Sequence, residues 1–365
     1  MPTRVLVVSH FNDFISARSK AFIFIGLAKL DFQITIMTDI STPFLELFYE
    51  VGIEVIDFSC KKKFDKQEIR TLHDFMEERK IQIAHLFYSA ATINGIRAAK
   101  GLPVKVVLYR GASANIHFLD PTAYFKYLHP RVDAIVCNSK GTEEYLKKNL
   151  LRKPNKAITI SKGHKMEWYS DVQALDIREK LSIPQETTLV VNVANNRPIK
   201  GVKYLLEGFS QIPSEKPIHL LLIGRDMDNK ENLDIITKGG MKDRVHILGH
   251  RKDVLEIEKS CDILVLASLG SESITRSVIE GMALGVAPII TNIPGNLPLV
   301  THEENGLLVP VADADAIREA ILRLYENEEL RKKFGQRSKE RIRTTLSNSE
   351  TVKKYETFYK DLVTK

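Results

Sequence analysis

Two glutamates, Glu272 and Glu280, are separated by seven residues in a segment rich in small and cap-forming side chains. The apolar run before them, residues 262–267, has the composition of a buried strand, and the helix that follows is expected to end near Gly285. Glu272 is then predicted at or just before the helix N-terminus, with Glu280 about two turns further along. Carboxylates and free backbone N–H groups at the carboxyl end of a parallel strand suit a polar, phosphate-bearing ligand. Ordinary exposed glutamates are the alternative, and the spacing alone leaves both interpretations open.

A pair of cations, Arg197 and Lys200, follows another apolar run. Residues 188–194 form the predicted strand, and a helical pattern begins directly after Lys200. Positive side chains beside the N–H groups of a helix start favour binding of a diphosphate. A polar loop with incidental basic residues is the alternative interpretation. The next predicted strand, 219–223, ends at Gly224, where the absence of a side chain permits close approach of a ligand.

Short β-branched runs alternate with helical patterns along the chain, which is typical of α/β proteins with parallel sheets. Candidate helices include 19–30, 66–79, 142–150, 201–211 and 254–259. Strands are predicted at 5–8, 34–38, 54–57, 83–87, 105–109, 134–137, 158–161, 188–194, 219–223, 245–248, 262–267, 287–291 and 306–309.

The chain is long enough for two domains, and the alternation is interrupted only at the non-periodic stretch 163–176. We expect an N-terminal domain at 1–168 and a C-terminal domain at 169–346, both α/β and doubly wound. The final segment, 347–365, has a capped start and an apolar stripe, and we expect this helix to pack back on the first domain.

Composition narrows the class of protein. Hydrophobic residues make up 44% and charged residues 27%, and no run approaches the ~18 apolar residues of a membrane span. The N-terminus leads directly into a strand, without the apolar run of a signal peptide. The three cysteines are far apart and not in metal-ligand spacing. We therefore expect reduced thiols and a cytoplasmic protein.

The net charge of +7 is unevenly distributed. Residues 147–165 contain seven basic and no acidic side chains, and Lys61, Lys62 and Lys63 form a second cluster. Such patches attract anionic surfaces, so an anionic membrane surface and a merely solvated face are both open interpretations. Nucleic acid is not expected as a partner, because no known nucleic-acid-binding motif is present.

Taken in order, the segments of the second half resemble the nucleotide-sugar-binding half of the retaining glycosyltransferases of family four, which have the GT-B fold. The likeness is specific over about residues 188–340 and extends over the first half only in outline. The matching elements are Arg197 with Lys200-Gly201, Ile223-Gly224, residues 245–249, the Glu272 to Glu280-Gly281 element with the small residues after it, and 305–309 followed by Asp313 or Asp315.

The resemblance implies two doubly wound Rossmann-like domains facing across a cleft, with the donor bound by the second. It implies that Glu280 bonds the ribose hydroxyls of the donor and that Glu272 lies against the transferred sugar. Ile274 and Thr275 would present N–H groups to the phosphates.

Arg197 and Lys200 would neutralise the diphosphate leaving group. This role is also expected on physical grounds, because departure of a nucleoside diphosphate builds negative charge. A cationic pair can replace the metal ion of other transferases. We expect a metal-independent reaction with no cofactor, in which a UDP- or GDP-sugar is the substrate.

The N-terminal half departs from the family at two places. The loop after the first strand, residues 9–20, has no glycine, and Arg18 would supply charge there instead. Arg110 stands where many relatives carry a histidine. His85 and His117 are the nearby histidines, and each is open to a functional or a purely structural interpretation. These four residues are the weaker candidates for contact with the acceptor.

The sequence thus predicts a retaining glycosyltransferase acting on a glycan or lipid-linked acceptor, in bacterial surface polysaccharide or lipopolysaccharide biosynthesis. It would be cytoplasmic, with peripheral attachment to the inner face of the plasma membrane. A nucleotide-sugar epimerase of the same architecture and a catalytically silent nucleotide-sugar-binding partner are the alternatives. An NAD-dependent dehydrogenase is not expected, because Gly-x-Gly-x-x-Gly follows neither domain's first strand.

Overall fold

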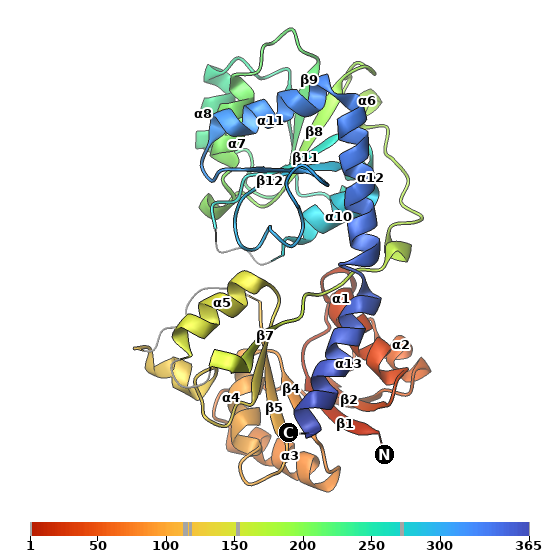
Figure 1. Cartoon of the computed structure of the whole chain (residues 1–365), viewed down its shortest axis with the longest axis vertical. Helices are drawn as coiled ribbons and strands as arrows, with labels where there is room; N and C mark the ends of the chain where they lie inside the picture. The colour runs from red at the N-terminus through yellow and green to blue at the C-terminus, as the bar shows by residue number, and fades with distance from the viewer. Residues whose placement is uncertain (1, 112–115, 117–118, 151–153, 271–273, 365) are drawn as a thin grey trace. The chain divides into compact units, whose positions relative to one another are not determined.

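The computed structural model of the chain describes residues 2–111, 116, 119–150, 154–270 and 274–364. These residues form two compact units, Met1–His164 with Leu346–Lys365, and Lys165–Thr345 (Figure 1). Each unit is built on its own parallel sheet. The division after His164 comes four residues earlier than the boundary expected from the sequence, and the chain returns to the first unit at Leu346.

The sheet of unit 1 has the strand order β3-β2-β1-β4-β5-β6-β7, and all its pairs are parallel. Val5 of β1 pairs with Ile34 of β2 and Ile83 of β4. Both faces of β1 are buried because helices cover each side, as expected for a parallel sheet. The strands are β1 (Thr3–Val8), β2 (Phe32–Thr38), β3 (Glu54–Asp57), β4 (Ile83–Leu86), β5 (Lys105–Arg110), β6 (Ala134–Cys137) and β7 (Ala157–Thr159).

Two layers of helices enclose this sheet. The core on one face joins Val5 and Val7 to α1 and α13, and the core on the other joins Leu6 and Val8 to α3, α4 and α5. Figure 1 shows α13 beside α1, and the two helices are in contact. The helices are α1 (Phe14–Ala28), α2 (Leu45–Glu50), α3 (Lys66–Glu78), α4 (Ser89–Ala98), α5 (Lys140–Asn149) and α13 (Asn348–Thr364), with 3-10 turns η1 (Pro121–Phe125) and η2 (Pro154–Lys156).

The sheet of unit 2 is also parallel, in the order β10-β9-β8-β11-β12-β13. Its strands are β8 (Thr188–Val193), β9 (Ile218–Ile223), β10 (Val245–Gly249), β11 (Ile263–Leu266), β12 (Ala287–Thr291) and β13 (Leu307–Val309). Its helices are α6 (Ile177–Lys180), α7 (Val202–Ser210), α8 (Lys230–Lys238), α9 (Val254–Lys259), α10 (Arg276–Leu284), α11 (Ala314–Glu326) and α12 (Glu328–Thr344), with 3-10 turns η3 (Met166–Trp168) and η4 (Pro198–Lys200).

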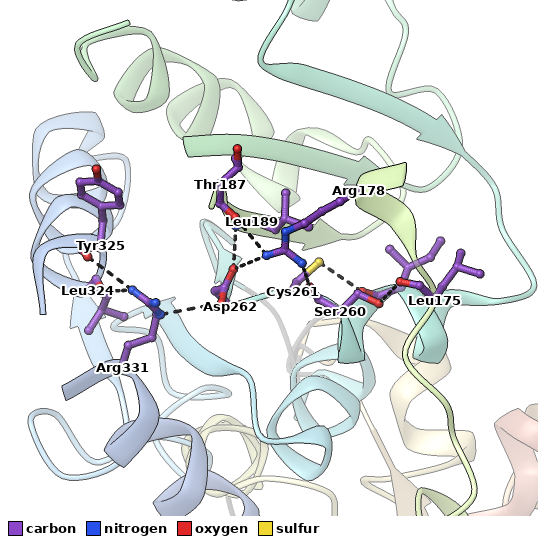
Figure 2. A network of polar contacts seen from close by, with 11 residues as sticks. Leu175, Arg178, Thr187, Leu189, Ser260, Cys261, Asp262, Leu324, Tyr325 and Arg331 are labelled. Carbon is purple, nitrogen blue, oxygen red and sulfur yellow. Dashed lines mark hydrogen bonds and ion pairs between the residues drawn. The ribbon is translucent and has the colours of Figure 1, made fainter. Parts of the chain in front are cut away.

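A polar network holds the amino end of β11 (Figure 2). Asp262 accepts hydrogen bonds from the Leu189 N–H (2.8 Å) and the Arg178 guanidinium (3.1 Å). Arg178 also donates to the main-chain oxygens of Thr187 (3.0 Å) and Ser260 (3.1 Å). The network therefore joins α6, β8, α9 and β11. It lies at the edge of the sheet where the strands begin, opposite to the edge formed by the carboxyl ends of the strands.

All the strands predicted from the sequence are present, with ends that differ by at most two residues. The first helix was predicted incorrectly: it begins at Phe14, because the Asp13 carboxylate accepts a hydrogen bond from the Ser16 N–H (2.6 Å) and caps it. Arg18 and Lys20 therefore lie within α1 and not in the preceding loop.

In both sheets the chain order reverses beside the first strand. The reversal falls between β1 and β4 in unit 1 and between β8 and β11 in unit 2. Ligands of doubly wound sheets bind outside the carboxyl ends of the strands at such reversals, because the two connections diverge there and leave a crevice. The strand order therefore identifies one candidate ligand position in each unit.

No helix in the described part of the chain is both long and apolar enough to cross a membrane. The three cysteines, Cys60, Cys137 and Cys261, are buried free thiols.

Candidate active site

The cationic loop of unit 2 lies against the chain that leaves β11. The N–H of Leu269 donates to the Ile199 oxygen (2.8 Å) within η4. Gly201 ends η4 at φ 62°, and a Cβ there would lie 2.0 Å from the main-chain oxygen of Ala267, so only glycine fits. Arg197 is exposed, whereas Lys200 is 7% exposed. The predicted diphosphate pair is thus positioned at the reversal between β8 and β11.

The N-terminus of α10 is held at the same edge of the sheet, where β8 ends. Thr275 is the N-cap residue, and the Ser277 hydroxyl donates to the Val193 oxygen at the end of β8 (2.9 Å). The Thr275 Oγ1 atom is buried and has no hydrogen-bond partner. Ile274 and Thr275 therefore precede the helix, and the first-turn N–H groups of α10 lie close to the loop that carries Lys200.

Glu280 lies in the second turn of α10 and is 5% exposed. Its Oε1 atom is 3.5 Å from the Nε atom of Arg276. Glu258 of α9 interacts electrostatically with Glu280, and burial, followed by that negative charge, raises the pKa of Glu258 well above its usual value. Burial beside Glu280 therefore favours the neutral form of Glu258, which avoids two adjacent negative charges. Glu272 lies outside the described residues, and its role stays a prediction.

Gly224, which follows β9, lets the chain pack closely against the ends of β8 and β10. Its φ is 147°, and a Cβ would lie 1.7 Å from the main-chain oxygen of Ala194. Its N–H donates to the Gly249 oxygen (2.8 Å). The backbone thus requires glycine here independently of any ligand.

The sequence reasoning missed a row of buried polar residues along the same edge. Asn192 donates to the Val265 oxygen (2.8 Å), and Asn296 donates to the Thr291 oxygen (2.9 Å). Oδ1 of Asn192, Oγ of Ser268 and Oδ1 of Asn296 are buried without a hydrogen-bond partner. Unpaired buried polar atoms are costly, so these oxygens are suited to a polar ligand or bound water. A polar residue inside an apolar run, as in Leu-Val-Val-Asn-Val at 189–193, was the available signal.

The weaker candidates of unit 1 occupy different environments. Arg18 is buried in α1. The Arg110 guanidinium lies 5.1 Å from the Tyr127 ring centroid. His85 is fully buried, with Nδ1 2.7 Å from the Tyr359 hydroxyl, and burial, followed by the charge of Lys20, lowers the pKa of His85 to about 3. This environment favours a structural role for His85. His117 lies outside the described residues.

Two family sequence models match the chain. Glycosyl transferases group 1 matches residues 173–341, and Glycosyltransferase Family 4 matches residues 24–167. N-acetyl-alpha-D-glucosaminyl L-malate synthase of Bacillus anthracis is 28% identical over 214 residues, 58% of this chain and 56% of that protein. UDP-Gal:alpha-D-GlcNAc-diphosphoundecaprenol alpha-1,3-galactosyltransferase of Escherichia coli is 25% identical over 279 residues, 73% of this chain and 72% of that protein.

Solved structures share the fold over almost the whole chain. A glycosyltransferase from Rickettsia africae superposes with a TM-score of 0.81 at 17% identity, covering 99% of each chain. Anabaena HepE, solved in complex with UDP, superposes with a TM-score of 0.75 at 18% identity, covering 99% of this chain and 100% of that one.

The two parallel-sheet α/β units define a protein of the GT-B class. The chain belongs to the group 1 glycosyltransferases, family four, and the family expected from the sequence is confirmed.

Proposed function

We propose that this protein transfers a sugar from a nucleotide diphosphate sugar, a UDP- or GDP-sugar, to a glycan or lipid-linked acceptor. The configuration at the sugar's anomeric carbon is retained, and the reaction uses no metal ion. The setting is the assembly of a bacterial surface polysaccharide or lipopolysaccharide. Support for the setting comes from the Escherichia coli relative, whose name specifies a diphosphoundecaprenol-linked acceptor.

One observation carries the proposal: the η4 loop and the N-terminus of α10 meet at the β8/β11 reversal. The Leu269 to Ile199 and Ser277 to Val193 hydrogen bonds hold them there. Lys200 and the N-terminus of α10 therefore belong to segments held at the same reversal, and each favours a negatively charged group. A nucleoside diphosphate is the ligand that this combination suits best.

The chemistry follows from where charge develops. As the bond between the sugar and the diphosphate breaks, the leaving oxygen becomes negative, and fixed cations and N–H groups aimed at it lower the barrier. Arg197 and Lys200 supply those cations, which is why no metal ion is needed. The departing phosphate oxygen accepts the proton of the acceptor hydroxyl, and Glu280 holds the ribose.

The test is to incubate purified protein with a panel of UDP- and GDP-sugars, measuring binding by calorimetry and donor hydrolysis by chromatography. We expect one donor to bind and to be hydrolysed slowly. The Lys200→Ala variant should lose on the order of a hundredfold in rate, since a leaving-group contact is removed. Glu280→Ala should weaken binding of the free nucleotide, whereas Glu272→Gln should mainly reduce turnover.

Lys203→Ala is the matched control, because this half-exposed lysine lies just beyond Lys200 and pairs with Glu207 and Glu231. Interconversion of sugars without transfer would instead identify an epimerase. Binding without turnover would identify a silent partner. Normal rates in both Lys200→Ala and Arg197→Ala would refute the diphosphate assignment.

We also propose a cytoplasmic location with peripheral attachment to anionic membrane. The supporting feature is an aromatic-basic patch, defined as Lys61, Lys62, Lys63, Phe64 and Phe125. The three lysines are exposed, and the Phe64 and Phe125 rings, 45% and 41% exposed, are in edge-on contact at 5.3 Å. Lysines and exposed aromatic rings together favour the interface of an anionic bilayer.

A further inference from the structure

Lys20 lies at the β1/β4 reversal, the candidate ligand position of unit 1. Its Nζ donates to the Ser9 Oγ (2.6 Å) and to the main-chain oxygen of His10, both directly after β1. The same ammonium is 4.3 Å from the ring centroid of Phe11 and 5.3 Å from that of Phe87, which directly follows β4. Lys20 thus reaches from α1 across the end of the sheet.

A second lysine faces the same group of rings. Lys162, in the segment after β7, holds its Nζ 4.5 Å from the Tyr109 ring centroid. Tyr109 stacks on Phe87 at 5.2 Å. Each lysine therefore lies over one of two stacked, partly exposed rings, and the two ammonium groups interact electrostatically.

These two cations have no counter-ion among the described residues. Burial, and then the charge of Lys162, lowers the pKa of Lys20 to about 7, and no carboxylate in the described part of the chain opposes this shift. Lys147 is a contrasting case, because its Nζ lies 2.5 Å from the Glu143 carboxylate. The ring faces attract the two ammonium groups, but the two like charges repel each other, and an anion between them would relieve the repulsion.

We propose that Lys20 and Lys162 form an anion-binding site that holds a carboxylate or phosphate group of the acceptor. The inference deepens the proposed transferase function and rests on it. The two relatives support the chemistry, since one is named for L-malate and the other for a diphosphate-linked acceptor. Both acceptor classes carry anionic oxygens that a pair of ammonium groups can bind.

The experiment separates this site from the donor site. The full-length Arg197→Ala/Lys200→Ala variant is titrated with inorganic phosphate and, separately, with malonate, and binding is followed by calorimetry. We expect one of the two probes to bind, and the affinity to fall at least tenfold when Lys20→Met or Lys162→Met is added. Lys29→Met, which changes an exposed lysine at the C-cap of α1, should leave the affinity unchanged. Preference for phosphate indicates a phosphorylated acceptor, and preference for malonate a carboxylate acceptor.

The affinity of the otherwise wild-type protein for UDP is measured in parallel. We expect Lys20→Met and Lys162→Met to leave it unchanged. Equal probe binding with and without both lysines would overturn the anion site. A matching loss of UDP affinity would overturn its assignment to the acceptor. Failure of UDP and GDP to bind any form, with anion binding intact, would count against the proposed function alone.

Discussion

The carboxyl group of Glu258 lies fully buried close to Glu280, and neither of its oxygens has a hydrogen-bond partner. Its raised pKa means that the neutral form persists in the folded protein to higher pH than in the unfolded chain, which ionises it above about pH 4.5. Its stabilising contribution is therefore present below pH 4.5 and is lost as pH rises towards the folded-state pKa.

We predict that Glu258→Gln removes this pH dependence. The difference in melting temperature between the variant and the wild type should increase in favour of the variant as pH rises from about 4.5. Thermal unfolding followed by circular dichroism across pH 4 to 8 checks this. Glu256→Gln, a partly exposed acid on the same helix, is the control and should track the wild type. Parallel curves for Glu258→Gln and wild type would contradict the prediction.

Individual residues also show the limits of sequence reasoning. The Arg197 and Lys200 pair could be identified because both stand between a strand pattern and a helix pattern. Lys20 could not be identified as one of a pair, since Lys162 is distant in sequence and only the fold brings them together. His85 has its bonding partner on the last helix, so the sequence left its role open.

At the scale of elements, the network around Asp262 supports the sheet that positions the candidate site (Figure 2). Asp262 is the common partner of the β8 N–H at Leu189, of Arg178, and more distantly of Arg331 at 4.0 Å. Removing it leaves the Leu189 N–H without this acceptor and takes the carboxylate away from the partly buried Arg178 guanidinium, which keeps only its main-chain acceptors.

We predict that Asp262→Ala lowers the free energy of unfolding by about 1.5–3 kcal/mol, the range for hydrogen bonds to charged groups. Urea unfolding measures this value. Asp234→Ala, an exposed acid on α8, should change it little. The affinity of the folded variant for UDP should stay that of the wild type, because the network lies at the opposite sheet edge. An unchanged urea midpoint would show that the network contributes nothing.

At the scale of the whole molecule, the two basic stretches found in the sequence differ in how the structure places their lysines. The 147–165 stretch contains no acid, yet in the structure Lys147 pairs with Glu143, and Lys156 donates to the Val132 oxygen. Lys61, Lys62 and Lys63 stay exposed beside Phe64 and Phe125. The aromatic-basic patch is therefore the better candidate for membrane contact.

We predict that the protein co-sediments with vesicles of phosphatidylcholine and phosphatidylglycerol, and not with vesicles of phosphatidylcholine alone. Each of Lys62→Met and Lys63→Met should weaken binding by about 1 kcal/mol, roughly fivefold, and high salt should weaken it further. Phe64→Ser should also reduce it, because the ring no longer enters the interface. Lys147→Met serves as the control, and a loss in that variant equal to the loss in Lys63→Met would refute the patch.

Local patterns in the sequence were sufficient to determine the α/β class, all the predicted strands and the nucleotide-sugar-binding resemblance of the second half. They were sufficient because β-branched runs, helix caps and loop residues such as Gly201 act within a few neighbouring positions. Only the tertiary structure decided the strand order, and with it the two reversals where ligands are expected. It also brought Lys20 close to Lys162, Lys147 to Glu143 and His85 to Tyr359. Electrostatic interactions and hydrogen bonds depend on distance in space and not on separation along the chain.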